Sequence, residues 1–394
     1  MPRILLVHNF YRQPGGEWAA VKAQISLLRE RGHEVIVYTR DSAEIERYRL
    51  WQKVAFFPAT VFSRRTYREV RDVIARERPD VAHVHNVFPL ISPAVYRALK
   101  ESGVPIVQTV HNFRFLCPNA LFYTHGRVCE RCKYGNILHA VRWKCYRRSY
   151  ILSALYALTI GLHRRWGTFG MIDRFIALTG FTAWKLVESG LATPDKVSIL
   201  GNFLPDPLPE PGSFEKRESY AVYLGRLSPE KGVEVLLEAV DGLPNLKVKV
   251  AGDGPQAGAL RELARQRGLH QLEFLGRVVG KGKWDLLREA MAVVVPSVCY
   301  ENFPFVALES LAVGTPVVVS NLGSLPYIVE DSKSGLLFRP GDAQDLRQKL
   351  AWLSEHSEKA LAMGRYGRDK VGKRFSALAH YETLRDIYAE VVAG

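Results

Sequence analysis

The feature that most constrains the fold is a regular alternation between short apolar runs, which predict buried strands, and stretches with helical spacing. Residues 3–9 form an apolar run, residues 17–31 have helical spacing that stops at Gly32, and residues 34–39 form the next apolar run. Further strands are predicted at residues 80–85, 105–111 and 174–179. This order predicts an α/β domain in which helices cover a parallel sheet.

The alternation stops at a proline-rich segment and then starts again. Residues 201–212 contain four prolines and no hydrophobic period, which is typical of a linker between domains. A second series of strands is predicted at residues 219–224, 246–251, 272–275, 292–295 and 316–319. We therefore expect two tandem Rossmann-like domains facing each other across a cleft. The expected domains are residues 1–200 and 216–375, joined by a linker at residues 201–215. A helix is expected at residues 376–394, and one option is that it packs back on the first domain.

The charge of the chain is unevenly distributed. The formal net charge is +14, and the whole basic excess falls in residues 1–200. Nucleic acid, an anionic membrane surface and a phosphorylated substrate are each compatible with such an excess. No Cys2His2, helix-turn-helix or RNP-like pattern is present, so nucleic acid is the least favoured of the three. The first residues lack the long apolar region of a signal peptide, so we expect a cytoplasmic protein, with peripheral binding at the inner face of the membrane as an option.

Three loops at the predicted carboxyl ends of strands carry the candidate site residues, because ligands of such sheets bind there. Gly15 and Gly16 open a helix after the first strand, where amide groups suit a phosphate, although a tight turn that binds nothing explains them equally well. Arg226 and Lys231 lie in a glycine-flanked loop where two cations can hold a diphosphate. The third loop contains two glutamates and amide groups for an anion: Glu301, Asn302, Phe303, Pro304, Phe305 and Glu309.

These motifs occur in a recognisable order. Gly225-Arg226-Leu227 with Lys231-Gly232, then Gly252-Asp253-Gly254, then the Glu-x7-Glu pair and Gly314-Thr315-Pro316 follow one another as in the family 4 retaining glycosyltransferases, which the chain resembles over nearly its whole length. The resemblance implies a GT-B fold in which the C-terminal domain holds a nucleotide-sugar donor.

The resemblance also implies roles for individual residues. Arg226 and Lys231 would hold the donor diphosphate, Glu301 the sugar hydroxyls and Glu309 the ribose. The amides of residues 302–305 would contact sugar and phosphate, and Val278 would lie near the base. From the other domain, Gly15 and Gly16 would close over the donor and His111 would lie beside the transferred sugar. A retaining, front-face transfer to a glycan or lipid-phosphate-linked acceptor is the implied reaction.

No catalytic metal is expected. The sequence contains no Asp-x-Asp, the common arrangement for a divalent ion on a diphosphate, so cations and amides must neutralise the leaving group. The alternatives are an epimerase on the same fold and a basic nucleic-acid-binding protein. An epimerase would not be expected to carry the Glu-x7-Glu pair together with Arg226 and Lys231.

Four cysteines form a separate group with the spacing C-x11-C-x2-C-x12-C, in what we interpret as an insertion at residues 117–145: Cys117, Cys129, Cys132 and Cys145. This pattern favours a structural zinc site over unligated or redox-labile thiols, both of which stay open. Downstream, an apolar stretch at residues 150–162 has basic residues at both ends. It predicts either a helix lying on anionic lipid or a core helix with charged ends.

Overall fold

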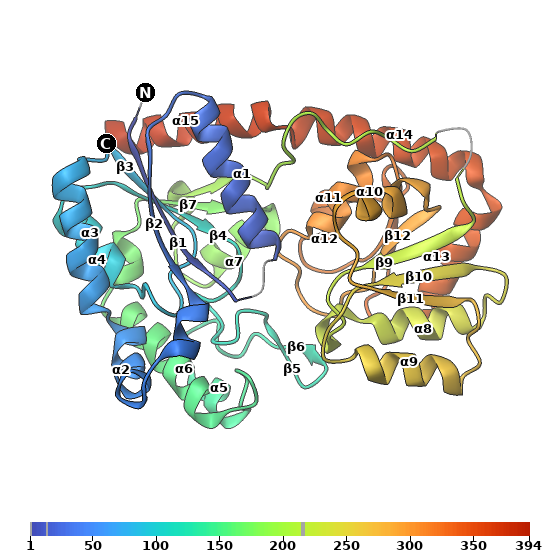
Figure 1. The fold of residues 1–394 in the computed structure, drawn as a ribbon, viewed down its shortest axis with the longest axis horizontal. Helices are drawn as coiled ribbons and strands as arrows, with labels where there is room; N and C mark the ends of the chain where they lie inside the picture. Colours follow the sequence, from blue (N-terminus) through green and yellow to red (C-terminus); the bar gives the residue numbers. More distant parts are fainter. Residues whose placement is uncertain (1, 13–14, 214–216) are drawn as a thin grey trace. The chain divides into compact units, whose positions relative to one another are not determined.

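The chain folds as two α/β units, seen here in a computed structural model that describes residues 2–12, 15–213 and 217–394 (Figure 1). The first unit comprises Met1–Thr124, Cys129–Phe203 and Ala377–Gly394, and the second comprises His125–Val128 and Leu204–Ser376. Each unit contains a six-stranded sheet whose strands all run parallel. Both sheets have helices packed against them, as the alternating pattern predicts.

The sheet of the first unit has the strand order β2-β1-β3-β4-β7-β8. Its strands are β1 (Ile4–Phe10), β2 (Val35–Asp41), β3 (Val81–Val84), β4 (Ile106–Val110), β7 (Arg174–Ala177) and β8 (Val197–Ile199). The α-helices of this unit are α1 (Gly16–Glu30), α2 (Leu50–Val61), α3 (Arg64–Glu77), α4 (Ala94–Glu101), α5 (Leu138–Arg142), α6 (Tyr150–Arg165), α7 (Gly180–Glu188) and α15 (Ala377–Ala393). Short 3-10 turns are η1 (Ser42–Arg47), η2 (Thr168–Met171) and η3 (Pro194–Lys196).

The core of the first unit includes the last helix of the chain. Ile4 and Leu6 of β1 are fully buried together with Leu28 of α1. Leu384 and Tyr388 of α15 belong to the same apolar cluster. Helix α15 therefore contributes to the core of the unit in which the chain begins.

The sheet of the second unit has the strand order β11-β10-β9-β12-β13-β14. Its strands are β9 (Tyr220–Leu224), β10 (Lys247–Ala251), β11 (Leu272–Gly276), β12 (Ala292–Val295), β13 (Val317–Ser320) and β14 (Gly335–Phe338). Its helices are η4 (Pro229–Lys231), α8 (Val233–Asp241), α9 (Ala257–Gln266), α10 (Gly280–Glu289), α11 (Phe305–Ala312), α12 (Leu325–Ile328), α13 (Ala343–Glu355) and α14 (Ser357–Arg374).

Three segments differ from the expectation. Helix α2, strand β14 and the helices α12, α13 and α14 are not among the elements that the sequence analysis predicts. Residues 117–145 form loops, a short hairpin of β5 (Tyr123–Thr124) and β6 (Arg127–Val128), and α5. At the expected linker, β8 ends at Ile199 and Leu204 pairs with Ser376, while residues 214 and 215 lie outside the described part of the chain.

Candidate functional site

The candidate residues of the second unit lie in loops and helix starts that follow the carboxyl ends of its strands β9, β11 and β12. The loop from Gly225 to Gly232 follows β9, and Val278 follows β11. The segment 301–305 connects β12 to α11, with Pro304 at the cap position of that helix. Since β9 and β12 are neighbours in the sheet, two of these loops come from adjacent strands.

The centre of this edge is an ion pair between Lys231 and Glu301. The Lys231 Nζ donates a hydrogen bond of 2.6 Å to Glu301 Oε1, and the Ser297 hydroxyl donates one of 2.5 Å to the same oxygen. Burial by itself lowers the pKa of Lys231, but the charge and hydrogen bond of Glu301 outweigh that effect and leave the pKa raised. Lys231 is therefore a fixed cation at the end of β9.

Gly232 makes this arrangement possible. Its φ is +66°, in the left-handed region, and a Cβ placed there would overlap the carbonyl oxygen of Pro296. Pro296 directly follows β12. The absence of a side chain at Gly232 thus lets the β9 loop and the end of β12 approach each other, which brings Lys231 to Glu301.

Arg226 has a different partner. Its guanidinium pairs with Glu230, which also accepts a hydrogen bond of 2.7 Å from the Ser228 hydroxyl. Burial alone raises the pKa of Glu230, but the bonds from Ser228 and Arg226 leave that pKa lowered. The Arg226 side chain is half exposed, so it stands at the surface of the loop.

The second glutamate of the Glu-x7-Glu pair has its own cation. Lys283 of α10 donates a hydrogen bond of 2.7 Å to Glu309 Oε1 on α11. Burial raises the pKa of Glu309, and Lys283 opposes that rise only in part. Lys283 and Ser297 were missed in the sequence. The only signal for Lys283 was its position in a glycine-lysine run just after β11.

In the first unit, His111 belongs to a group of histidines at the ends of three neighbouring strands. His85 Nδ1 and His111 Nε2 share a hydrogen bond of 2.8 Å, and the rings of His83 and His85 are stacked. Burial lowers the pKa of His8, His83 and His111 to about 3, and that of His85 is also well below its usual value. The four imidazoles are therefore neutral. Sequence reasoning found only His111, because the other three stand inside apolar strand patterns.

A buried carboxyl lies next to this group. Glu17, in the first turn of α1, accepts a hydrogen bond of 3.2 Å from Asn112, and its Oε1 lies 4.0 Å from His8 Nδ1. Burial raises the pKa of Glu17 to about 7. Gly15 caps α1 in an extended conformation and Gly16 is its first residue, while the preceding Gln13 and Pro14 lie outside the described residues.

The four grouped cysteines of the predicted zinc site line one small cavity of about 10 Å³, together with His139. All four are free thiols. Burial raises the pKa of Cys117 to about 11 and that of Cys132 to about 12. In the part of the chain that the structure describes, no three His, Cys, Asp or Glu side chains are arranged to hold a metal ion.

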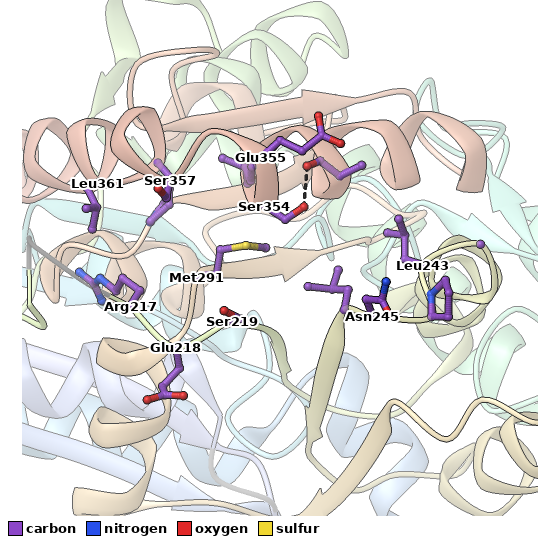
Figure 2. Close-up of a pocket in the computed structure, with 17 residues that line it drawn as sticks. Arg217, Glu218, Ser219, Leu243, Asn245, Met291, Ser354, Glu355, Ser357 and Leu361 are labelled. Carbon is purple, nitrogen blue, oxygen red and sulfur yellow. Dashed lines mark hydrogen bonds between the residues drawn. The ribbon is translucent and has the colours of Figure 1, made fainter.

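A pocket of about 510 Å³ in the second unit lies at the opposite edge of the sheet (Figure 2). Ser219, Leu246, Met291 and Pro316, each directly before a strand, contribute to its lining. It therefore lies at the amino ends of the strands, and none of the predicted site residues lines it. Among the described helices, none has the length and hydropathy needed to span a bilayer.

Comparison with known proteins agrees with this arrangement. Residues 14–205 match the family described as Glycosyltransferase Family 4, and residues 207–370 match Glycosyl transferases group 1. The chain is 34% identical over 245 residues to a D-inositol 3-phosphate glycosyltransferase of Saccharomonospora viridis, covering 56% of each protein. Across four curated relatives that include this one, the match spans 34% to 66% of the relative's length.

Solved structures share the fold over the whole chain. A sucrose-phosphate synthase of Thermosynechococcus elongatus superposes with a TM-score of 0.74 at 18% identity, covering 100% of both chains. Anabaena HepE in complex with UDP-glucose superposes with a TM-score of 0.70 at 17% identity, covering 99% of this chain and 100% of that one. With its two family matches and its GT-B fold, this chain belongs to the family 4, group 1 glycosyltransferases.

Proposed function

We propose that this protein transfers a sugar, with retention of configuration, from a nucleotide-diphosphate sugar to a hydroxyl of an acceptor. The observation that carries the proposal is the Lys231–Glu301 pair, 2.6 Å long, at the carboxyl ends of β9 and β12. It sets a fixed cation beside a carboxylate at the edge of the sheet where ligands of such folds bind. HepE, which shares the fold, has been solved with UDP-glucose, and this supports a nucleotide sugar as donor.

The reaction breaks the bond between the sugar C1 and the donor diphosphate. Negative charge develops on the departing diphosphate, and preorganised donors lower the energy of that transition state. Lys231, Arg226 and the amide N–H groups of Asn302, Phe303 and Phe305 supply them, so a catalytic metal is not required. The acceptor oxygen then bonds to C1 on the face that the diphosphate leaves, and the acceptor proton passes to a diphosphate oxygen.

The remaining residues orient the donor. Glu301 accepts hydrogen bonds from the sugar hydroxyls, and Glu309, held by Lys283, accepts those of the ribose. Val278 lies against the base, and Gly15 and Gly16 leave room for the diphosphate beside α1. The neutral His111 donates to or accepts from the transferred sugar without adding a charge.

We propose a glycan or lipid-phosphate-linked acceptor, with transfer of a hexose on the cytoplasmic side of the cell envelope. The basic excess of residues 1–200 favours an anionic acceptor over a neutral one. In addition, we propose that the four cysteines, which line one cavity but are not arranged to hold a metal ion in the described residues, move together to bind a structural zinc ion. Zinc would hold together a segment whose regular structure is limited to a short hairpin and α5.

The test is a panel of UDP-, GDP- and ADP-sugars offered with and without lipid-linked and soluble glycan acceptors. Release of nucleoside diphosphate that depends on the acceptor, together with an α-linked product from an α-linked donor, is the expected result. Interconversion of the donor sugar without an acceptor would instead identify an epimerase.

A further inference from the structure

The net charge of the chain is concentrated in two segments that contain no acidic residue. Residues 47–68 contain six Lys and Arg and no Asp or Glu, and residues 131–172 contain eight and none. Together they hold fourteen positive charges, which equals the formal net charge of +14. The rest of the chain is therefore balanced.

The fold brings these two segments together in the first unit. The first contains α2 and the second contains α5 and α6; α2 packs against α6, and α5 packs against α6 (Figure 1). Segments that begin more than eighty residues apart thus form one surface. We call it the α2–α6 face, made of residues 47–68 and 131–172.

Helix α2 presents its apolar side to solvent. Leu50, Trp51 and Val54 are 80%, 65% and 66% exposed, whereas Thr60 is fully buried. Residues 50, 54 and 57 lie on one side of a helix because they are about one turn apart. This orientation is the reverse of that in an ordinary surface helix, where the apolar side faces the core.

Helix α6 is exposed in the same way. Ile151 is 66% exposed, and Tyr150 and Leu158 are also exposed, while Leu155 and Tyr156 face the core. The exposed Arg147 and Arg148 directly precede the helix, and Arg165 ends it. Exposed apolar side chains of α6 therefore have cations at both ends of the helix.

Most of these cations have no acidic partner. Of the fourteen, only Arg65 and Lys133 form ion pairs with residues that the structure describes, Arg65 with Glu69 and Lys133 with Glu130 and Glu188. An unpaired cation beside exposed aliphatic and aromatic side chains suits a bilayer interface, where the apolar groups enter the headgroup region and the cations meet lipid phosphates. Nucleic acid would neutralise these positive charges but would not bury the exposed aliphatic side chains.

From this arrangement we infer that the α2–α6 face binds the surface of an anionic lipid bilayer, with Leu50, Trp51, Val54 and Ile151 inserted among the headgroups. The face lies entirely within the first unit. Binding to vesicles needs no donor or acceptor sugar, so it can be measured whether or not the transfer reaction proposed above occurs.

The experiment is sedimentation of the full chain with vesicles of phosphatidylcholine alone or of phosphatidylcholine mixed with phosphatidylglycerol, at low and high salt. Binding to the mixed vesicles at low salt and little binding to the neutral ones are expected. The Trp51→Ser/Val54→Ser variant is expected to bind the mixed vesicles at least about tenfold more weakly, because two inserted apolar side chains are lost. Arg147→Glu/Arg148→Glu is expected to lose the salt-sensitive part of the binding.

Matched control variants test whether vesicle binding depends on the α2–α6 face or on any exposed tryptophan or arginine. Trp184→Ser removes a tryptophan of α7 that is 52% exposed and lies outside both segments. Arg76→Glu/Arg78→Glu makes the same charge change at exposed residues of α3 and its cap. Both controls should bind like the wild type. The inference would be overturned if all variants bound the vesicles equally or if the wild type did not bind them. It would also be overturned if the α2–α6 face bound RNA or a second copy of the chain instead.

Discussion

Lys231 and Glu301, seventy residues apart in the chain, meet through a hydrogen bond of 2.6 Å between Nζ and Oε1. The lysine comes from the turn after β9 and the glutamate from the loop after β12. Their approach depends on a glycine at position 232 and on the Ser297 hydroxyl, which donates to the same carboxylate oxygen. This ion pair brings the family motifs after β9 and β12 together in one candidate site.

Replacing either member of this pair should remove most of the transfer activity. Lys231→Ala is expected to lower kcat about 10²–10³-fold, because the developing charge on the diphosphate loses a fixed donor. Glu301→Gln should lower the rate as well and raise KM for the donor. Steady-state kinetics with the preferred nucleotide sugar measures both effects, with the exposed Lys333→Ala as the control. Full activity in Lys231→Ala or Glu301→Gln would show that the site has been assigned wrongly.

Lys283→Met should affect donor binding more than turnover. The change leaves Glu309 buried without its cation and raises the pKa of that carboxyl further, since Lys283 now opposes the effect of burial. Weaker binding of nucleoside diphosphate, measured by calorimetry at neutral pH, is the expected result, with a smaller effect on kcat. An unchanged affinity would contradict the proposed role of Glu309 at the ribose.

Gly232→Ala should be much more damaging than the same change at a comparable open position. Gly103 also has a positive φ, of +71°, but has nothing within 4 Å of an added Cβ, so Gly103→Ala should cost about 1–2 kcal/mol of backbone strain. At Gly232 the overlap with Pro296 adds about 1–3 kcal/mol and displaces Lys231. Urea unfolding of the two variants provides the comparison. Equal losses of stability would contradict a close approach between the two loops.

The buried histidines should make the fold sensitive to acid. His8, His83 and His111 have pKa values lowered to about 3 in the folded chain, so the unfolded chain binds protons first as the pH falls below about 6.5. The free energy of unfolding should fall between about pH 6.5 and 3, by about 1.4 kcal/mol per pH unit for each histidine. Urea unfolding at a series of pH values measures this slope, and a flat profile would contradict it.

Glu17 should have the opposite effect on the pH dependence of the free energy of unfolding. Its pKa is raised to about 7, so the folded chain holds this proton more tightly and gains stability as the pH falls from about 7 to 4.5. Glu17→Gln removes that gain. The variant should therefore be more stable than the wild type above pH 7 and should lose stability more steeply on acidification.

Metal analysis tests the cysteine proposal. The purified wild type is expected to contain one zinc ion per chain, which Cys132→Ser should lose, with reduced thermal stability. Cys299→Ser is the matched control, because Cys299 is equally buried but lies in the second unit, outside the cysteine-lined cavity. A metal-free wild type with reactive thiols, or with disulfides among the four, would exclude the zinc site.

Much of the fold was predictable because its signals are local. The strand predicted at residues 292–295 has the same boundaries as β12, and the other predicted strands match the observed ones within two residues at each end. Helix α2 was not predictable in the same way. Its apolar side faces solvent, so its pattern lacks the relation between hydrophobicity and burial on which such predictions depend.

The amino-acid sequence by itself determined the alternation of strands and helices, the two-part organisation and the loops in which the candidate residues stand, because each depends on periodicity or motif order along a short stretch. Only the tertiary structure decided which side chains meet. It paired Lys231 with Glu301 and Lys283 with Glu309, and it joined α2 to α6. Such partners depend on which distant strands lie side by side in a sheet, and no local pattern in the chain records that order.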